Sequence, residues 1–130
     1  MKSFLKKVIA QSPDDLQIIS AICAESKVKI SDIKYLPSTK IFLLSISRID
    51  KENNETKFVN SVVKFDFIEN SKSKNIDQSQ EENILELLAI DLFKKEKNYE
   101  IVLLFSENRI ITLQAEVIEI ELDNVEKIND

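Results

Sequence analysis

The chain of 130 residues contains no glycine, histidine or tryptophan, and it has a single cysteine, Cys23. The absence of histidine excludes Ser–His and Cys–His nucleophile pairs and histidine metal sites. The absence of glycine excludes Walker A loops, dinucleotide-binding fingerprints and nucleophile elbows, because each needs glycine at fixed positions. One thiol cannot form an intrachain disulfide or a cysteine zinc cluster. We therefore predict no catalytic residue, no metal site and no cofactor.

The charge balance is acidic, with 23 Asp and Glu against 18 Lys and Arg, a net charge of −5 and a pI near 4.9. Dedicated nucleic-acid binders usually have a basic surface, and anionic lipids also attract basic segments. No stretch reaches the roughly 18 apolar residues of a transmembrane helix, and lysines interrupt the apolar N-terminal stretch where a signal peptide would lie. We expect a cytoplasmic protein with neither a nucleic-acid nor a membrane partner.

The clearest local signal is a helix start at Ser12-Pro13-Asp14-Asp15. Serine caps free backbone amides, proline fits the first helical position, and aspartates favour the positive end of the helix dipole. Apolar residues then recur at helical spacing as far as Cys23, which predicts a helix over residues 13–25. Because Cys23 lies on the apolar side of this helix, we expect a buried, unreactive thiol.

Beyond Ser26 the apolar residues recur at every second position. Such alternation predicts strands with one buried face, here over residues 27–31, 41–49, 58–68, 99–105 and 109–122. Before the helix, the short apolar stretch over residues 4–9 is a further strand candidate. In the last of these runs the apolar residues change sides near Glu116. A β-bulge or a crossing strand would explain that change.

Residues 69–83 are polar except for Ile76, and they are predicted to form a surface loop. The next stretch, residues 83–95, fits two structures. Leucines at helical spacing after a Ser79–Glu82 capping box favour a helix, whereas the dense apolar run before a polar turn favours a hairpin strand. We favour the strand.

Together these elements predict one domain over residues 1–130 with an α+β fold. One N-terminal helix packs on a curled, mainly antiparallel sheet of six or seven strands, which could form a partly closed barrel.

The amino-acid composition also indicates an AT-rich genome, because the chain has nineteen isoleucines, sixteen lysines and ten asparagines but only two arginines.

Several short segments, in this order along the chain, resemble a known family. They include Asp14-Asp15-Leu16, Asp32-Ile33-Lys34-Tyr35-Leu36-Pro37, Arg48-Ile49-Asp50 and Leu85-Glu86-Leu87-Leu88-Ala89-Ile90. On these residues the chain resembles the alphaproteobacterial domain-of-unknown-function family 2948 across nearly its whole length. It departs from the family pattern at Lys51, where an aromatic residue is typical, at Val117, where cysteine is usual, and at Glu107-Asn108, where glycines are usual. The resemblance implies a small cytosolic bacterial protein and implies no activity.

Arg48 and Asp50 are the first candidate ligand-binding residues. By strand alternation both lie on the same face as the apolar residues that precede them. A guanidinium in such a place needs a carboxylate or phosphate partner. Arg48 therefore either binds an anionic ligand or completes the core in a pair with Asp50 or Asp66, and we expect it to be at least half-buried. Tyr35 is the third candidate.

Three carboxylates, Glu119, Glu121 and Asp123, stand on one side of the last predicted strand. A hard cation such as magnesium prefers oxygen ligands of this kind. The same alternation is typical of a solvated strand face, and this is the interpretation that we favour.

Two classes of function remain open. The first is a non-catalytic interaction module that binds a protein, a small anionic ligand or a second copy of the chain. The alternative is a small histidine-independent enzyme that uses carboxylate, lysine or tyrosine groups. We favour the module because the usual general base is missing. Two carboxylates that converge beside Arg48 or Tyr35 would favour the enzyme, and a flat apolar patch would favour the module.

Overall fold

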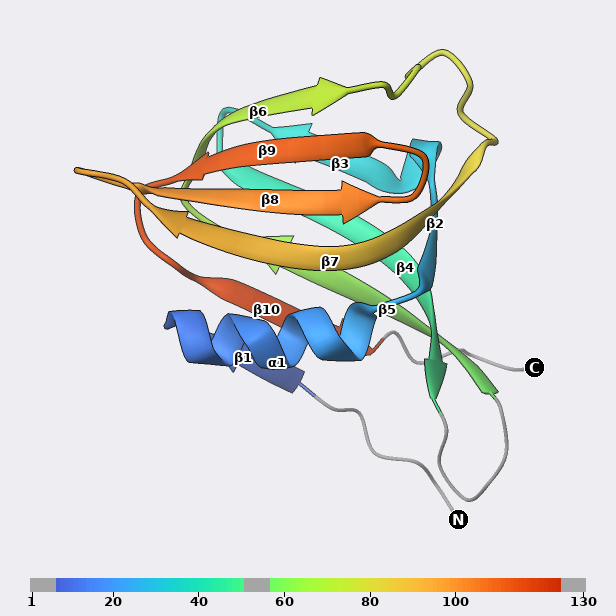
Figure 1. The fold of residues 1–130 in the computed structure, drawn as a ribbon, viewed down its shortest axis with the longest axis horizontal. Coiled ribbons are helices and arrows are strands. Elements are labelled where there is room, and N and C mark those ends of the chain that lie inside the picture. The colour runs from blue at the N-terminus through green and yellow to red at the C-terminus, as the bar shows by residue number, and fades with distance from the viewer. Residues whose placement is uncertain (1–6, 51–56, 125–130) are drawn as a thin grey trace.

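The computed structural model describes residues 7–50 and 57–124, without the side chains of Asp50 and Lys57 (Figure 1). One α-helix, one 3-10 helix and ten strands follow one another in these ranges. They are β1 (Lys7–Ala10), α1 (Pro13–Cys23), β2 (Ser26–Lys29), η1 (Ile30–Asp32), β3 (Ile33–Leu36), β4 (Ile41–Asp50), β5 (Lys57–Phe65), β6 (Ile68–Lys74), β7 (Ile84–Lys94), β8 (Tyr99–Phe105), β9 (Arg109–Ala115) and β10 (Ile120–Asn124).

All ten strands belong to one sheet, and every pairing in it is antiparallel. The strand order is β1-β10-β5-β4-β2-β7-β8-β9-β6, and β3 pairs with β4 next to β2. The path ends at β1 and β6, so the sheet is curled but not closed into a barrel. The predicted α+β class with one N-terminal helix is confirmed.

The predicted number of six or seven strands is wrong, because the sheet has ten. The alternation at residues 27–31 corresponds to β2, which ends at Lys29 before η1, whereas β3 has only four residues, too few for a clear alternation. Strand β6 is almost wholly polar, so hydrophobic patterning does not reveal it. The run 109–122 contains two strands instead of one.

The inward side chains of the sheet and of α1 form one apolar core. At its centre the rings of Phe42 and Phe65 meet edge to face, with centroids 5.8 Å apart. Helix α1 lies across one end of the curled sheet and packs on β7, β1 and β4 (Figure 1). Its buried residues are Leu16, Ile19 and Cys23.

Helix α1 begins as the sequence predicts, since the Ser12 hydroxyl accepts a hydrogen bond from the Asp15 backbone N–H at 3.2 Å. It ends at Cys23, two residues earlier than predicted. The chain turns there because Ala24 has φ −59° and ψ 137° and Glu25 has φ 68°, the pattern of a type II turn. With eleven residues, the one α-helix of the described ranges is too short to cross a membrane.

The ambiguous stretch 83–95 is strand β7, as we favoured. The predicted surface loop over residues 69–83 is shorter than expected, because residues 68–74 form β6. Residues 75–83 remain as an irregular segment, called the strap below. The change of sides near Glu116 is not a β-bulge. Residues 116–119 leave the sheet between β9, which pairs with β8 and β6, and β10, which pairs with β5 and β1.

The lack of glycine leaves positive φ angles to residues that carry a Cβ atom. Within the described residues these are Glu25, Lys40, Phe67, Asn75, Glu107 and Asn108. The left-handed conformation costs a residue with a Cβ roughly 1–2 kcal/mol. Two of these residues, Glu107 and Asn108, are adjacent in the turn between β8 and β9.

We predict that Glu25→Gly stabilises the fold by roughly 1 kcal/mol relative to Glu25→Ala. Both variants remove an exposed carboxylate near the C-terminal end of α1, but only glycine removes the Cβ that disfavours φ 68°. Urea unfolding of the two variants and of the parent measures the difference. An alanine variant at least as stable as the glycine variant would contradict the assignment of strain to this turn.

Candidate functional site

Arg48 lies on the inward face of β4 and is 7% exposed, so the expectation that it is at least half-buried is confirmed. Its Nε donates a hydrogen bond to Ser61 Oγ at 3.0 Å, and its Nη2 donates to Asn124 Oδ1 at 2.9 Å. Ser61 Oγ in turn donates to Asn124 Oδ1 at 2.8 Å. One guanidinium therefore joins β4, β5 and β10.

The predicted carboxylate partner Asp66 is wrong. Asp66 lies beyond the far end of β5 and pairs with Lys64 at 3.8 Å. The strand register brings Ser61 and Asn124 close to Arg48 instead. Ser61 on β5 is paired with Ile46, two residues before Arg48 on the same face of β4, and on its other side Ser61 is paired with Asn124 of β10. The other predicted partner, Asp50, has a side chain outside the described residues. The hydrogen bonds of Arg48 favour its structural interpretation.

Two further groups line the inward face next to Arg48. Pairing of Lys27 with Ser47 places Ser26 opposite Arg48, and the buried Ser26 hydroxyl has no hydrogen-bond partner within the described residues. Cys23 is fully buried, as expected. Burial raises the pKa of its thiol to about 12, and the positive charge of Arg48 offsets only part of that effect. The thiol is therefore protonated at neutral pH.

Tyr35 lies at the opposite end of β4 from Arg48, because β3 pairs with residues 41–44. Its hydroxyl donates to the backbone oxygen of Ile68 at 2.8 Å, and its ring packs against Phe42 at a centroid distance of 6.5 Å. The structure does not bring Tyr35 and Arg48 together. Their bonded partners in the described chain are neutral oxygens, which gives no support to the enzyme hypothesis.

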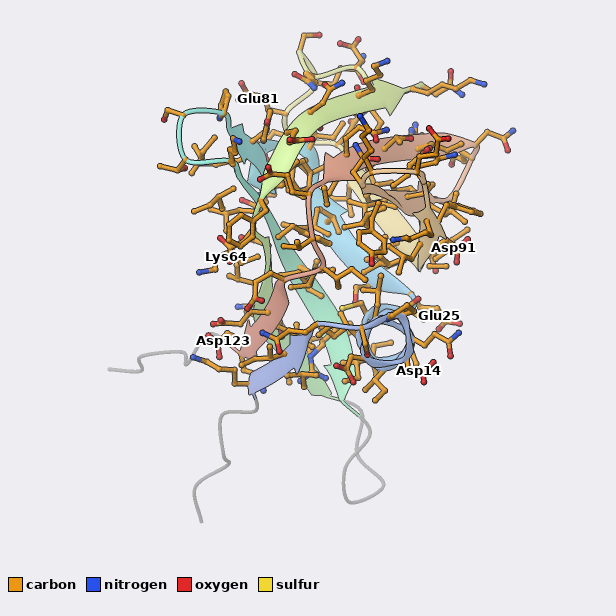
Figure 2. The ribbon with its side chains drawn as sticks, turned by 90° about the vertical axis from the view of Figure 1, so that its left-hand side faces the viewer. Asp14, Glu25, Lys64, Glu81, Asp91 and Asp123 are labelled. Atoms are coloured by element: carbon orange, nitrogen blue, oxygen red, sulfur yellow. The ribbon has the colours of Figure 1, made fainter. Side chains whose placement is uncertain are left out.

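A broad sheet face on the other side of β4 is not covered by any described element. We call it the outer face. It consists of the outward side chains of β2, β4, β5 and β10: Lys27, Lys29, Ile41, Leu43, Ser45, Ser47, Ile49, Phe58, Asn60, Val62, Lys64, Glu121 and Asp123. In Figure 2, Lys64 and Asp123 point away from the side of the molecule that α1 occupies.

The outer face has an apolar centre. Leu43 and Val62 lie half-buried there, and Phe58 is 66% exposed. Two hollows of about 390 and 700 Å³ flank this centre and share Val62. At the β2 side, Ile84 of β7 adds a side chain that is 61% exposed.

Ion pairs surround the apolar centre of the outer face. Lys7 lies 3.3 Å from Glu121 and 3.8 Å from Asp123, while Lys27 lies 3.7 Å from Glu86. Partial burial raises the pKa of Glu121, but its hydrogen bonds with Asp123 and Lys7 and the nearby lysine charges outweigh burial and lower that pKa.

The three carboxylates of the last predicted strand are not gathered at one point. Glu119 lies outside β10 and accepts a hydrogen bond from Gln11 Nε2 at 2.9 Å, while Glu121 and Asp123 share Lys7. The part of the chain that the structure describes has no group of three metal-ligating side chains that could hold an ion.

A pocket of about 470 Å³ lies where the sheet does not close, between β3 and β6. We call the gap between these two strands the seam. Four isoleucines form the floor of the pocket, and polar residues form its mouth. The lining residues are Ile30, Ile33, Ile76, Ile111, Ser31, Lys34, Ser73, Gln78 and Glu81.

The strap borders this pocket and is held by local hydrogen bonds. Asp77 Oδ1 accepts from the Ser79 backbone N–H at 3.0 Å and from Ser79 Oγ at 2.6 Å, and these bonds lower the pKa of Asp77. The Asn75 side chain donates to the backbone oxygen of Asn108 at 2.7 Å. The strap is thus tied to the turn between β8 and β9.

Sequence reasoning missed both surfaces. The signal for the outer face was present, because residues 41–44 are apolar on both sides of the strand, a pattern typical of a strand covered on both faces. The pocket had no such signal, because β6 and the strap are polar and their position relative to β3 depends on the whole sheet.

The fold and these surfaces define a class of protein: an α+β domain with one helix across the end of a curled, unclosed antiparallel sheet. The chain matches the model of the family described as Protein of unknown function (DUF2948) over residues 6–129. It belongs to this family, which confirms the resemblance seen in its sequence. No curated protein and no solved structure matches the chain.

We predict that Arg48→Lys destabilises the protein by about 1–3 kcal/mol, because lysine cannot reach both Ser61 and Asn124 with a planar fork. The one other arginine supplies a matched control. Arg109 pairs at 3.1 Å with Glu107, whose side chain is 74% exposed, so Arg109→Lys should change stability by less than about 0.5 kcal/mol. Thermal melts of both variants provide the measurement. Equal effects of the two substitutions would contradict the structural role of Arg48.

We predict that the Cys23 thiol is unreactive in the folded protein. A disulfide reagent at about pH 8 should label the chain only after unfolding by denaturant, because the folded thiol is buried and protonated. The raised pKa also means that the folded state holds this proton more tightly than the unfolded state. Its contribution to stability is therefore present below about pH 9 and declines as the pH rises toward 12. Rapid labelling without denaturant would contradict this account.

Proposed function

We propose that this protein is a non-catalytic, cytosolic interaction module and that its outer face binds a partner protein. The apolar centre of that face carries the proposal. Leu43 and Val62 occupy the outward side of the two central paired strands, and no described element covers them. Uncovered apolar surface with a polar rim is typical of protein–protein interfaces.

Two further observations support a protein as the bound molecule. The hollows on the outer face adjoin each other through Val62, so they present one broad shallow surface in place of a deep small-molecule site. The rim carries both positively charged lysines and negatively charged carboxylates, which suits a partner protein whose surface also has charges of both signs. The protonated Cys23 and the engaged hydroxyl of Tyr35 offer no nucleophile for the enzyme alternative.

The proposal predicts that Val62→Lys abolishes partner binding, because it places a charge at the apolar centre. Tagged wild-type protein, cross-linked in extract from its own cells, should retain at least one protein that Val62→Lys does not retain. Phe93→Lys is the matched control, since Phe93 is 51% exposed on β7, outside the outer face. This control should behave as the wild type does.

Sedimentation velocity of the purified proteins completes the test. A wild-type dimer that Val62→Lys converts to a monomer would identify the partner as a second copy of the chain, which also supports the proposed face. A wild-type monomer that captures no protein would overturn the proposal. So would capture that Val62→Lys leaves unchanged.

A further inference from the structure

Strand β6 leaves part of the inner wall of the sheet unfilled. Its residues Ser71 and Ser73 are the Cα partners of Leu113 and Ile111 on β9, and these two apolar side chains are buried in the core. Directly paired residues of neighbouring strands lie on the same face of a sheet, so both serines face inward. The inward positions of β8 hold isoleucine, leucine and phenylalanine instead. The pocket of about 470 Å³, which Ser73 and Ile111 both line, lies where β6 has these small side chains.

The strap forms a fixed wall of this pocket. The Ile30 N–H donates a hydrogen bond to the Asn83 backbone oxygen at 2.9 Å, and the Ser31 N–H donates to the Glu81 backbone oxygen at 3.0 Å. At its other end the strap is held by the Asn75 side chain, which bonds to the turn between β8 and β9. A pocket whose walls are held in this way is formed before a ligand binds, so little affinity is lost in ordering it.

The floor of the pocket is apolar. Ile30 and Ile111 are buried there as part of the core, while Ile33 and Ile76 are half-buried and pack against it. A ligand therefore meets four branched aliphatic side chains and no charge at the inner end of the pocket. Such a floor favours a ligand with a bulky apolar group, because burial of apolar surface supplies the affinity.

The mouth of the pocket has one charged side chain of each sign, Lys34 of β3 and Glu81 of the strap. Neither has an ion pair within the described residues, whereas the nearby Lys29 and Glu82 pair with each other at 3.5 Å. Glu81 lies at the end of the molecule opposite α1 (Figure 2). A ligand with a single charge would be attracted by one of the two side chains and repelled by the other. A ligand with both an ammonium and a carboxylate group is attracted by both.

We propose that this pocket binds a free α-amino acid with a large apolar side chain, at a site distinct from the outer face. The apolar side chain of the ligand lies on the isoleucine floor. Its carboxylate contacts Lys34 and its ammonium contacts Glu81, while the Ser31 hydroxyl and the Gln78 amide at the mouth offer further hydrogen bonds. A free amino acid fits this arrangement because it has both charged groups on one carbon atom, at one end of an apolar body.

The probes are L-leucine, L-isoleucine, L-valine, L-methionine and L-phenylalanine, titrated into the full chain by isothermal calorimetry. We expect saturable one-to-one binding of at least one of them. The analogues of that amino acid without its ammonium or without its carboxylate should bind at least about fivefold more weakly, because each loses one charge-assisted contact. For leucine these analogues are 4-methylpentanoate and 3-methylbutylamine. They test the proposal without any change to the protein.

Two substitutions assign the charged contacts. Lys34→Met should weaken binding of the amino acid at least about fivefold but leave the affinity of the amine analogue unchanged, because that analogue has no carboxylate. Glu81→Gln should weaken the amino acid equally and leave the carboxylate analogue unchanged. Lys97→Met and Glu96→Gln are the matched controls, since both residues are exposed between β7 and β8, and they should have no effect.

A third substitution fills the pocket. Ser73→Leu adds an apolar side chain at an inward position and should abolish binding, with a thermal melt to show that the variant is folded. Lys72→Leu, at the adjacent outward position of β6, should bind as the wild type does. So should Val62→Lys on the outer face, which makes this test independent of the partner protein proposed above.

Three outcomes would overturn the proposal. The first is the absence of saturable binding for all five amino acids up to about 10 mM, a weaker affinity than any specific site would show. The second is binding of a singly charged analogue as tightly as of its parent amino acid, which would assign the pocket to a simple anion or cation. The third is unchanged binding by a folded Ser73→Leu variant, which would place the ligand elsewhere.

Discussion

The pairing of β4 with three strands is the interaction on which the rest of the structure depends. Strand β4 forms a ladder with β5 from Phe42 to Asp50, and on its other edge it pairs first with β3 and then with β2. A strand with neighbours on both edges has a fixed register, because a slip of one residue would turn its core side chains to solvent. Its inward row then builds the core, and its outward row forms the centre of the outer face.

Arg48 shows what this register imposes on a polar side chain. Arg48 is the last inward residue of β4 whose side chain the structure describes. Burial of its guanidinium without hydrogen-bond partners would lower the stability of the fold by several kcal/mol. Ser61 and Asn124 supply side-chain oxygens from β5 and β10, the next two strands in the sheet, so hydrogen bonds to neighbouring strands compensate for the burial of the guanidinium. The sequence indicated a buried arginine through strand alternation. It could not indicate the partners, because they depend on which strands lie side by side.

The same limit explains which parts of the fold could be predicted. Helix α1 and the strands with strong alternation follow from local signals such as the Ser12 cap and the apolar parity of β4. Strand β6 has no local signal, because its pairing with β9 is set by residues far away in the sequence. The change of sides near Glu116 marks the break after Ala115, but it does not show that the following strand pairs with β5 and β1. Tyr35 illustrates the consequence for the site. Its proximity to Ile68 arises only because β3 and β6 meet across the curled sheet, so no spacing in the sequence reveals it.

The sheet does not close between β3 and β6, because β6 is the last strand of its path. A closed barrel would pair β6 with β3 and leave no free edge at the seam. In the observed sheet, β6 pairs with β9, and the Tyr35 hydroxyl bonds to the Ile68 backbone oxygen where a ladder between β3 and β6 would lie. The outer face differs because its edges are all paired and only its side chains are available. A partner at the outer face therefore contacts side chains, because the backbone of its strands is already engaged in the ladders.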